Sequence, residues 1–229
     1  DLLVAYDGQS ISYDASGNPT SYYNGTRWNF TWANGRNLAT AVAGTTNASF
    51  SYDSDGLRTS KTVGTATTNY LYSEGKLLRQ TSGNNTWDFF YDANGVPYAL
   101  KYNGTVYYYV TNLQGDVIQL VNAGGTAVAT YEYDPYGNVI EATGNMAEIN
   151  PLRYRGYYYD SETEMYYLES RYYDPAIGRF INADDIGYLD ADTSLAAMDL
   201  FAYCANDPVN RFDDAGNLSL PNWAKVAIG

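Results

Sequence analysis

The chain has 229 residues and carries 13 Lys and Arg against 26 Asp and Glu, which gives a formal net charge of -13. Binding to nucleic acid or anionic lipid depends on clustered Lys and Arg, and the sequence has no such cluster. There is no His, which excludes Ser-His and Cys-His catalysis and imidazole metal sites, so any chemistry must use carboxylates, Tyr, Lys or Arg.

The length suits one large domain or one repeat array with a cap. The single cysteine, Cys204, cannot form an intrachain disulfide, and we expect it to be a small buried apolar residue. No signal peptide is visible, and no apolar run approaches the roughly 20 residues of a membrane span. Asp1 falls inside a repeat and the last residues, 218–229, stop as they turn apolar, so we expect a piece of a longer protein.

A turn motif recurs about every 20 residues, a period typical of repeat architectures. Each copy, such as YDANGV at Tyr91 to Val96, predicts a strand that ends in an aromatic residue, a turn in which Asp or Asn bonds its own backbone, and a second strand. The glycine of the turn is expected at positive φ. These glycines are Gly17, Gly35, Gly56, Gly75, Gly95, Gly115 and Gly137. Further hairpins with type I′ turns are predicted at Asn24-Gly25 and Asn103-Gly104.

The repeat array is predicted to be β throughout, because no 3.6-residue apolar period persists before Asp190. The segment from Thr105 to Val110 alternates with both faces partly apolar, which suits a sheet that curls and either packs on itself or encloses something. We interpret the 26 Tyr as structural residues whose rings cover the sheet and whose hydroxyls reach water or a carbonyl. A carbohydrate-binding or adhesin surface is the alternative. Asp53 to Gly56 resembles half of a calcium loop but lacks the later acidic ligands, so we interpret it as a turn.

The segment from Pro151 to Asp185 is unusually dense in Tyr, Arg and Asp. Its arginines alternate with Tyr and Asp, so we expect Arg–carboxylate pairs and Arg stacked on Tyr. These arginines are Arg153, Arg155, Arg171 and Arg179. One helix is predicted over Ser194 to Cys204, with Thr193 or Ser194 as its N-cap.

The sequence resembles the Rhs/YD-repeat proteins in three features. These are the recurring Tyr-Asp turns, the segment RYRGYYYDSETEMYYLESRYYDPAIGRFINADD after Leu152, and the segment NDPVNRFDDAG after Ala205. That group includes the C subunits of Tc toxins, bacterial wall-associated proteins and the teneurins, and the closing part is similar to the Rhs-associated core domain. The resemblance implies a mainly β fold. Residues 1–145 would form a β-hairpin strip that spirals into a shell, 146–217 a plug with one short helix, and 218–229 the start of a C-terminal passenger.

The resemblance also implies a function, which is to enclose and present a polymorphic C-terminal toxin. The expected partners are the chain's own toxin segment, the upstream repeats of the full-length protein, and a cell-surface or secretion-system component. A secreted or cell-surface location in bacteria is expected, with no cofactor, no metal, no nucleic acid and no membrane span in this fragment. The alternative function is a cell-surface adhesion or glycan-binding module without cleavage.

Some members of the family cleave themselves at the junction with the toxin as aspartyl proteases. Two carboxylates held together can share a proton, which suits a protein without His. By the match of motifs the resemblance implies cleavage between Asn217 and Leu218 by Asp184 and Asp213. Asp185 and Asp214 are the alternate carboxylates, and Arg171 or Arg179 is the orienting cation. Asp185, Asp214 and Asn217 depart from the family's pattern, and the alternative interpretation makes Asp184 and Asp213 turn and helix-cap residues.

Overall fold

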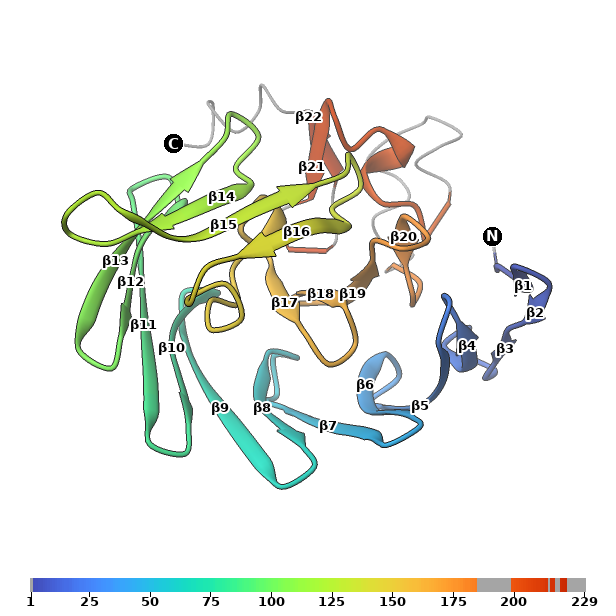
Figure 1. Cartoon of the computed structure of the whole chain (residues 1–229). Helices are drawn as coiled ribbons and strands as arrows, with labels where there is room; N and C mark the ends of the chain where they lie inside the picture. The colour runs from blue at the N-terminus through green and yellow to red at the C-terminus, as the bar shows by residue number, and fades with distance from the viewer. Residues whose placement is uncertain (1, 185–198, 214, 217–218, 222–229) are drawn as a thin grey trace.

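The computed structural model describes residues 2–184, 199–213, 215–216 and 219–221. Within these residues a 14-stranded antiparallel sheet, here called the strip, curves around a smaller body, here called the plug, which comprises the described residues between 146 and 217 (Figure 1). The strip consists of β3 (Ser12–Tyr13), β4 (Pro19–Tyr23), β5 (Arg27–Ala33), β6 (Asn37–Ala43), β7 (Thr46–Tyr52), β8 (Arg58–Val63), β9 (Ala66–Ser73), β10 (Lys76–Ser82), β11 (Asn85–Tyr91), β12 (Pro97–Tyr102), β13 (Thr105–Thr111), β14 (Val117–Val121), β15 (Ala127–Tyr133) and β16 (Val139–Thr143). The predicted mainly β fold is confirmed.

The plug contains a four-stranded sheet and lies on the concave side of the strip (Figure 1). Its elements are η1 (Tyr154–Gly156), β17 (Tyr158–Asp160), β18 (Met165–Leu168), β19 (Arg171–Asp174), β20 (Arg179–Phe180), η3 (Cys204–Asn206) and β21 (Arg211–Asp213). After the plug, β22 (Ser219–Pro221) pairs with β21. A small hairpin of β1 (Ala5–Tyr6) and β2 (Gln9–Ser10) precedes the strip. Neighbouring strands of the strip follow one another in the chain, so the strip is a meander of hairpins.

The turns of the strip have the predicted chemistry. The seven glycines of the turn motif all have positive φ, between 75° and 93°. In the turn that begins at Asp92, the carboxylate Oδ1 accepts the backbone N–H groups of Asn94 and Val96, each at 2.9 Å. Asp14, Asp53 and Asp134 do the same in their turns. The interpretation of Asp53 to Gly56 as a turn is therefore confirmed.

One of the two predicted type I′ turns is wrong. Asn103 and Gly104 both have positive φ, at 47° and 89°, as such a turn requires. At the β4–β5 hairpin only Gly25 has positive φ. The side chain of Asn24 instead donates to Asp174 of the plug at 2.8 Å, so a contact distant in sequence replaces the local preference.

The repeated aromatic residue links each unit of the strip to the unit before it. The hydroxyls of Tyr52, Tyr91 and Tyr133 donate to the carbonyls of Leu38, Leu77 and Val117 at 2.8 to 3.0 Å. Each bond joins the end of one strand to the start of a strand about 15 residues earlier. The predicted role of the tyrosines, a ring on the sheet and a hydroxyl on a carbonyl, is confirmed at these positions.

The plug sheet packs aromatic residues on both of its faces. Tyr158 and Tyr172 contact the strip, with ring centroids 5.5 Å from Tyr70 and 5.7 Å from Phe50. The other face belongs to a second buried cluster, made of Tyr154, Tyr157, Tyr166, Leu168, Tyr173, Phe180, Tyr203 and Cys204. Cys204 is fully buried, as predicted. The plug therefore has a core of its own in addition to the core that it shares with the strip.

The last turn of the strip, residues 134–138, is held by three tyrosines of this second cluster. Tyr154, Tyr166 and Tyr173 donate to the carbonyls of residues 135, 137 and 136 at 2.8, 2.8 and 2.6 Å. A Cβ atom at Gly137 would lie 2.6 Å from the ring of Tyr154, so the close approach requires glycine. The end of the strip is thus fixed directly onto the plug.

The helix predicted over Ser194 to Cys204 is wrong in the part that the structure describes, residues 199–204. Ala202 forms an isolated antiparallel bridge with Arg179 of β20. Pairing with β20 takes the place of helical hydrogen bonds, because backbone groups that bond a strand are not available to a helix. The first part of the predicted helix lies outside the described residues.

Candidate functional site

The plug holds a buried cation, Arg171, on which several of the predicted site residues converge. Arg171 is the first residue of β19 and pairs with Leu168 across the tight turn from β18, in which Glu169 has a φ of 51°. Its side chain is 3% exposed, and its guanidinium carbon lies 3.6 Å from the ring centroid of Phe180. Strand pairing, the tight turn and ring stacking therefore fix the position of the guanidinium.

The structure brings the two predicted carboxylates, Asp184 and Asp213, onto this guanidinium. Arg171 Nη2 lies 2.7 Å from Asp184 Oδ2 and 3.5 Å from Asp213 Oδ2. Both side chains are largely buried, at 11% and 2% exposure. Burial lowers the pKa of Arg171 from its usual value, and the two carboxylates oppose that shift. Of the two arginines proposed to orient the pair, Arg171 is the one whose contacts fit that role.

Asp213 is held by its backbone as well as by its side chain. The hydroxyl of Tyr157 donates to the Asp213 carbonyl at 2.5 Å and accepts the Asp213 N–H at 3.3 Å. Asp213 Oδ1 in turn accepts the N–H of Gly216 at 2.6 Å. One carboxylate oxygen of Asp213 therefore bonds the backbone of Gly216, while the other lies 3.5 Å from Arg171 Nη2. The predicted turn role of Asp213 and its place in the pair are both compatible with this geometry.

The carbonyl of Gly216 is the second centre of contacts at the site. Arg171 Nε donates to it, and Ser170 Oγ lies 2.9 Å from it and 2.7 Å from the carbonyl of Ala215. Sequence reasoning missed Ser170 and Tyr157, because each is one polar residue within a segment of similar residues and its partner lies about 45 to 56 positions away. No local pattern marks either of them.

The remaining site residues are placed elsewhere or are not described. Arg179 lies against Asp199, with Nη2 at 3.7 Å from Oδ1, and its guanidinium is 5.1 Å from the ring centroid of Phe201. The alternates Asp185 and Asp214, and the predicted cleavage residues Asn217 and Leu218, lie outside the described residues.

The expected pairing of the plug arginines is confirmed. Arg155 Nε lies 3.4 Å from Asp116 Oδ1, and the Arg155 guanidinium lies 5.4 Å from the ring centroid of Tyr154. Arg153 stacks over Tyr159 at 4.3 Å and pairs with Glu148 at 3.6 Å.

A buried ion network joins the plug to the middle of the strip. Asp160 of β17 is fully buried and contacts Arg58 Nη1 at 2.5 Å and Lys61 Nζ at 2.6 Å. Burial alone would raise the pKa of Asp160, but the two cations outweigh burial and lower it. Arg58, also fully buried, lies 4.4 Å from the ring centroid of Tyr167 and 4.8 Å from that of Tyr70. All charges in this network are paired, which suits a structural connection.

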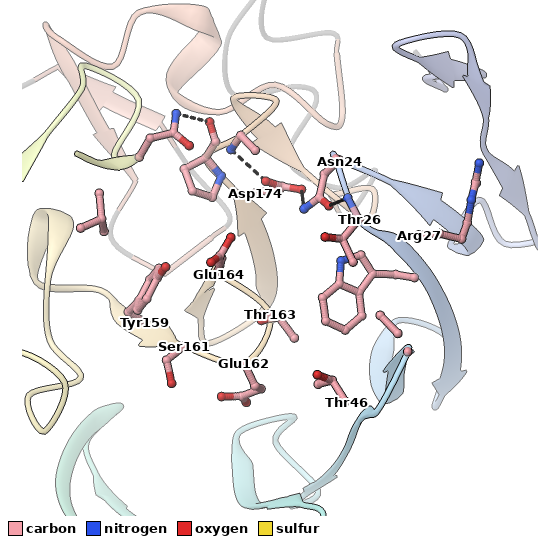
Figure 2. Close-up of a pocket in the computed structure, with 18 of the residues that line it drawn as sticks. Asn24, Thr26, Arg27, Thr46, Tyr159, Ser161, Glu162, Thr163, Glu164 and Asp174 are labelled. Atoms are coloured by element: carbon pink, nitrogen blue, oxygen red, sulfur yellow. Dashed lines mark hydrogen bonds between the residues drawn. The ribbon is translucent and has the colours of Figure 1, made fainter. Parts of the chain in front are cut away.

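A cavity of about 800 Å³ lies between the strip and the plug (Figure 2). Its walls come from the β4–β5 and β6–β7 hairpins on one side and from the plug turns at residues 161–164 and 174–176 on the other. Asp174 in this wall accepts from the Tyr22 hydroxyl and the Asn24 amide, each at 2.8 Å. Burial raises the pKa of Asp174 to about 6, although these hydrogen bonds oppose the shift. No cluster of metal-binding side chains is found among the described residues, and no described helix is long and apolar enough to cross a membrane.

Solved structures match the fold. The crystal structure of TcdB2-TccC3-Cdc42 superimposes with a TM-score of 0.71 at 22% identity, over 90% of this chain and 11% of that chain. A Photorhabdus luminescens Tc holotoxin pore matches with a TM-score of 0.68 at 20% identity, over 89% of this chain and 10% of that chain. At such identities the likeness shows a common fold.

Curated relatives match about half of the chain or less. The tRNA3(Ser)-specific nuclease WapA of Bacillus spizizenii is 38% identical over 116 residues, which are 50% of this chain and 5% of that protein. Salivary gland surface protein 1 of Aedes aegypti is 32% identical over 119 residues, 52% of this chain and 3% of that protein. Double-stranded DNA deaminase toxin A of Burkholderia cenocepacia is 34% identical over 86 residues, 36% of this chain and 6% of that protein. The chain therefore spans a small part of the length of each.

The sequence profile of the Teneurin YD-shell family matches residues 78–209, which is more than half of the chain. The matched range runs from β10 into the plug and includes Arg171 and Asp184, but it ends before β21 and Asp213. Together with the fold shared with the TcdB2-TccC3 shell, this match confirms the resemblance to the YD-repeat proteins. The chain belongs to the teneurin YD-shell family of Rhs and YD-repeat proteins.

Proposed function

We propose that this piece of a YD shell encloses and presents a C-terminal toxin. The observation that carries the proposal is the position of the plug on the concave side of the strip, because the plug closes the curved sheet on that side. We assign residues 1–145 to the shell wall, 146–217 to the plug and 218–229 to the start of the passenger. The end of β16 at Thr143 supports the first boundary.

The partners we propose are the passenger itself, the upstream repeats, and a cell-surface or secretion-system component, in a secreted or cell-surface protein. The names of relatives support this assignment, since they include a nuclease, a deaminase toxin and a surface protein. Encapsulation is tested by protease protection of a passenger in the full-length protein. We expect the passenger to resist protease while the shell is folded and to be digested after the shell is unfolded. Digestion at the rate of the free passenger would contradict enclosure.

We further propose that the plug cleaves its own chain near Asn217 and Leu218. The contacts of Asp184 and Asp213 with one buried guanidinium support this proposal. One carboxylate would take a proton from water and the other would donate a proton to the leaving nitrogen, while Arg171 holds both in place.

Self-cleavage is tested by the intact and fragment masses of the wild-type chain, of Asp184→Asn and of Asp213→Asn. Asp88→Asn is a matched control, because Asp88 pairs with Arg79 on the strip, away from the plug. We expect fragments from the wild type and the control, and a single uncut mass from the two site variants. A folded wild-type chain that stays uncut would show that the two aspartates are structural.

The alternative function, adhesion or glycan binding, stays a prediction with one observation in its favour. Phe90, Tyr98 and Tyr108 of the strip are 39%, 48% and 44% exposed, and the rings of Phe90 and Tyr98 lie 6.3 Å apart. Trp28 and Trp87, in contrast, are buried. Glycan binding by the wild-type chain that Tyr98→Ala abolishes would favour this alternative over a shell without a ligand of its own.

A further inference from the structure

We infer that Asn34–Gly35 is a site of spontaneous chemical modification, at which the folded chain converts Asn34 to aspartate and isoaspartate. The site lies in the turn between β5 and β6, and Asn34 lines a cleft between the strip and the plug. The reaction needs only water, because the nucleophile and the leaving group both belong to the chain. This inference is independent of the proposed encapsulation and of the proposed self-cleavage.

The chain contains four Asn-Gly dipeptides, and each lies in a loop between neighbouring strands of the strip. In such a dipeptide the glycine has no side chain to hinder attack of its own backbone nitrogen on the asparagine amide, so a five-membered ring can form. The attack requires that the amide and the glycine N–H be free to approach each other. The four sites therefore differ in reactivity according to how firmly the structure holds these two groups. Their asparagines are Asn24, Asn34, Asn94 and Asn103.

At Asn34 neither group is held. Asn34 is exposed, and its side chain has no hydrogen-bond or ion-pair partner among the described residues. The N–H of Gly35 likewise has no partner in the described part of the chain. In the turn of YDANGV, by contrast, the carbonyl of Asp92 accepts the N–H of Gly95 at 3.1 Å. The copy WANGR has no Asp at its start, so the Gly35 nitrogen stays open to reaction.

Asn103–Gly104 has the same dipeptide and nearly the same backbone, but its amide is held. The φ values of Asn34 and Asn103 are 51° and 47°, those of their glycines are 86° and 89°, and both asparagines are exposed. Asn103 Oδ1 accepts the N–H of Thr86 at 2.9 Å, and Asn103 Nδ2 donates to Asn85 Oδ1 at 2.8 Å. Both hydrogen bonds must break before the amide can be attacked. We therefore expect Asn103 to react roughly 10-fold or more slowly than Asn34.

The other two dipeptides are restrained in different ways. Asn24 Nδ2 donates to Asp174 at 2.8 Å and Asn24 Oδ1 accepts the N–H of Thr26 at 3.2 Å, so this amide is held on both sides. At Asn94 the side chain is open, but the N–H of Gly95 is already bonded to a carbonyl. The expected order of reaction is Asn34 first, then Asn94, then Asn24 and Asn103.

The reaction exchanges ammonia for water in two steps. The Gly35 nitrogen loses its proton to solvent and bonds to Cγ of Asn34, while the bond from Cγ to Nδ2 breaks and the leaving nitrogen takes up a proton. Water then adds to one of the two carbonyl carbons of the ring, and the ring C–N bond at that carbon breaks. Opening at the side-chain carbonyl gives aspartate. Opening at the main-chain carbonyl gives isoaspartate, in which the main chain runs through the former side chain.

The products would disturb contacts at the boundary of strip and plug. The carbonyl of Gly35 accepts the Asn18 amide at 2.6 Å, and isoaspartate inserts an extra methylene into the main chain beside it. The cleft that Asn34 lines has a volume of about 430 Å³, and Arg36 is a cation in its wall. The new carboxylate would join three others in the same wall, which are those of Asp53, Asp55 and Glu169. We therefore expect the modification to loosen this turn.

The test follows all four dipeptides by peptide mass mapping while the purified full chain ages at mildly alkaline pH, once folded and once in denaturant. In the folded chain we expect the mass change for replacement of NH2 by OH at Asn34 first, with Asn103 in the same digest as the control. In denaturant the two sites should react at similar rates, because glycine follows both. Equal rates at the two sites in the folded chain would overturn the inference. So would a folded chain without product at Asn34 after the unfolded chain has reacted.

Two variants test the restraint and the consequence. Asn85→Ala removes one acceptor from the Asn103 amide, and we expect Asn103 to react roughly fivefold faster while Asn34 keeps its rate. An unchanged rate at Asn103 would overturn the role assigned to the hydrogen bonds. Asn34→Gly removes the amide and keeps a residue that accepts positive φ. Limited proteolysis at residues 33–37 should speed up on ageing in the wild type and not in Asn34→Gly, and equal change in both would overturn the expected loosening.

Discussion

A single glycine shows how strictly the turn of the repeat limits its residues. Gly95 has a φ of +75°, and an added Cβ would lie 3.2 Å from Cε of Lys76. Gly95→Val places a β-branched residue in the left-handed region, and we expect the free energy of unfolding to fall by more than about 1 kcal/mol. Ala93→Val in the same exposed turn is the control and should have little effect. Denaturant unfolding of both variants measures the difference, and equal midpoints would contradict the turn assignment.

Asp174 makes stability depend on pH in a direction that is unusual for a carboxyl group. Its pKa in the folded chain is about 6, above the ordinary value of 3.8, so the folded state binds the proton more tightly than the unfolded state. This contribution to stability is therefore greatest in acid and is lost as the pH rises to about 6. Stability is lost because, at neutral pH, the folded chain holds the ionised Asp174 carboxylate away from water.

The prediction compares wild type with Asp174→Asn at pH 5 and at pH 7.5. The amide does not ionise, so the wild type should gain about 1 kcal/mol relative to the variant on going to pH 5. Glu162, whose pKa is also raised by burial, is present in both proteins, so the comparison isolates Asp174. A difference in unfolding free energy that does not change with pH would show that Asp174 keeps an ordinary pKa.

At the scale of elements, the connection between β8 and β17 depends on charges that are fully enclosed. Asp160→Asn would leave Arg58 buried without its carboxylate, and we expect a loss of about 3 to 5 kcal/mol in unfolding free energy. The pair Arg79–Asp88 has the same 2.5 Å separation, but Arg79 is 52% exposed. Asp88→Asn is therefore the control and should change stability little, because water screens the exposed pair. Equal effects of the two substitutions would refute the view that the buried network joins strip and plug.

The elements that the sequence predicted well are those set by neighbouring residues. A turn such as Asp92 to Val96 carries its own acceptor and its own glycine, so its conformation follows from a few adjacent positions. The helix over Ser194 to Cys204 had a good local pattern, yet the pairing of Ala202 with Arg179 overrides it in the described part. The fold and the arginine pairs could be predicted. The contacts of Tyr157 with Asp213 and of Ser170 with Ala215, in contrast, depend on packing between distant segments.

At the scale of the whole molecule, the strip and the plug each cover apolar surface that the other would expose. Phe50 and Tyr70 of the strip are buried against Tyr172 and Tyr158 of the plug, and the last turn of the strip is held by plug tyrosines. A curved sheet with one aromatic face needs such a cover, because an uncovered face of this size favours association. We therefore expect the two parts to unfold in one transition.

Residues 1–145 expressed alone test this dependence. We expect the isolated strip to bind a hydrophobic dye, to associate as its concentration rises, and to lose the cooperative thermal transition of the full chain, because its concave face and its strand edges are then open. The full chain with the surface substitution Ser51→Ala is the control for expression and handling. A monomeric strip with a sharp transition at the midpoint of the full chain would mean that the plug only occupies a shell wall that is stable by itself. In that case the curved sheet would be stable without contacts from the plug.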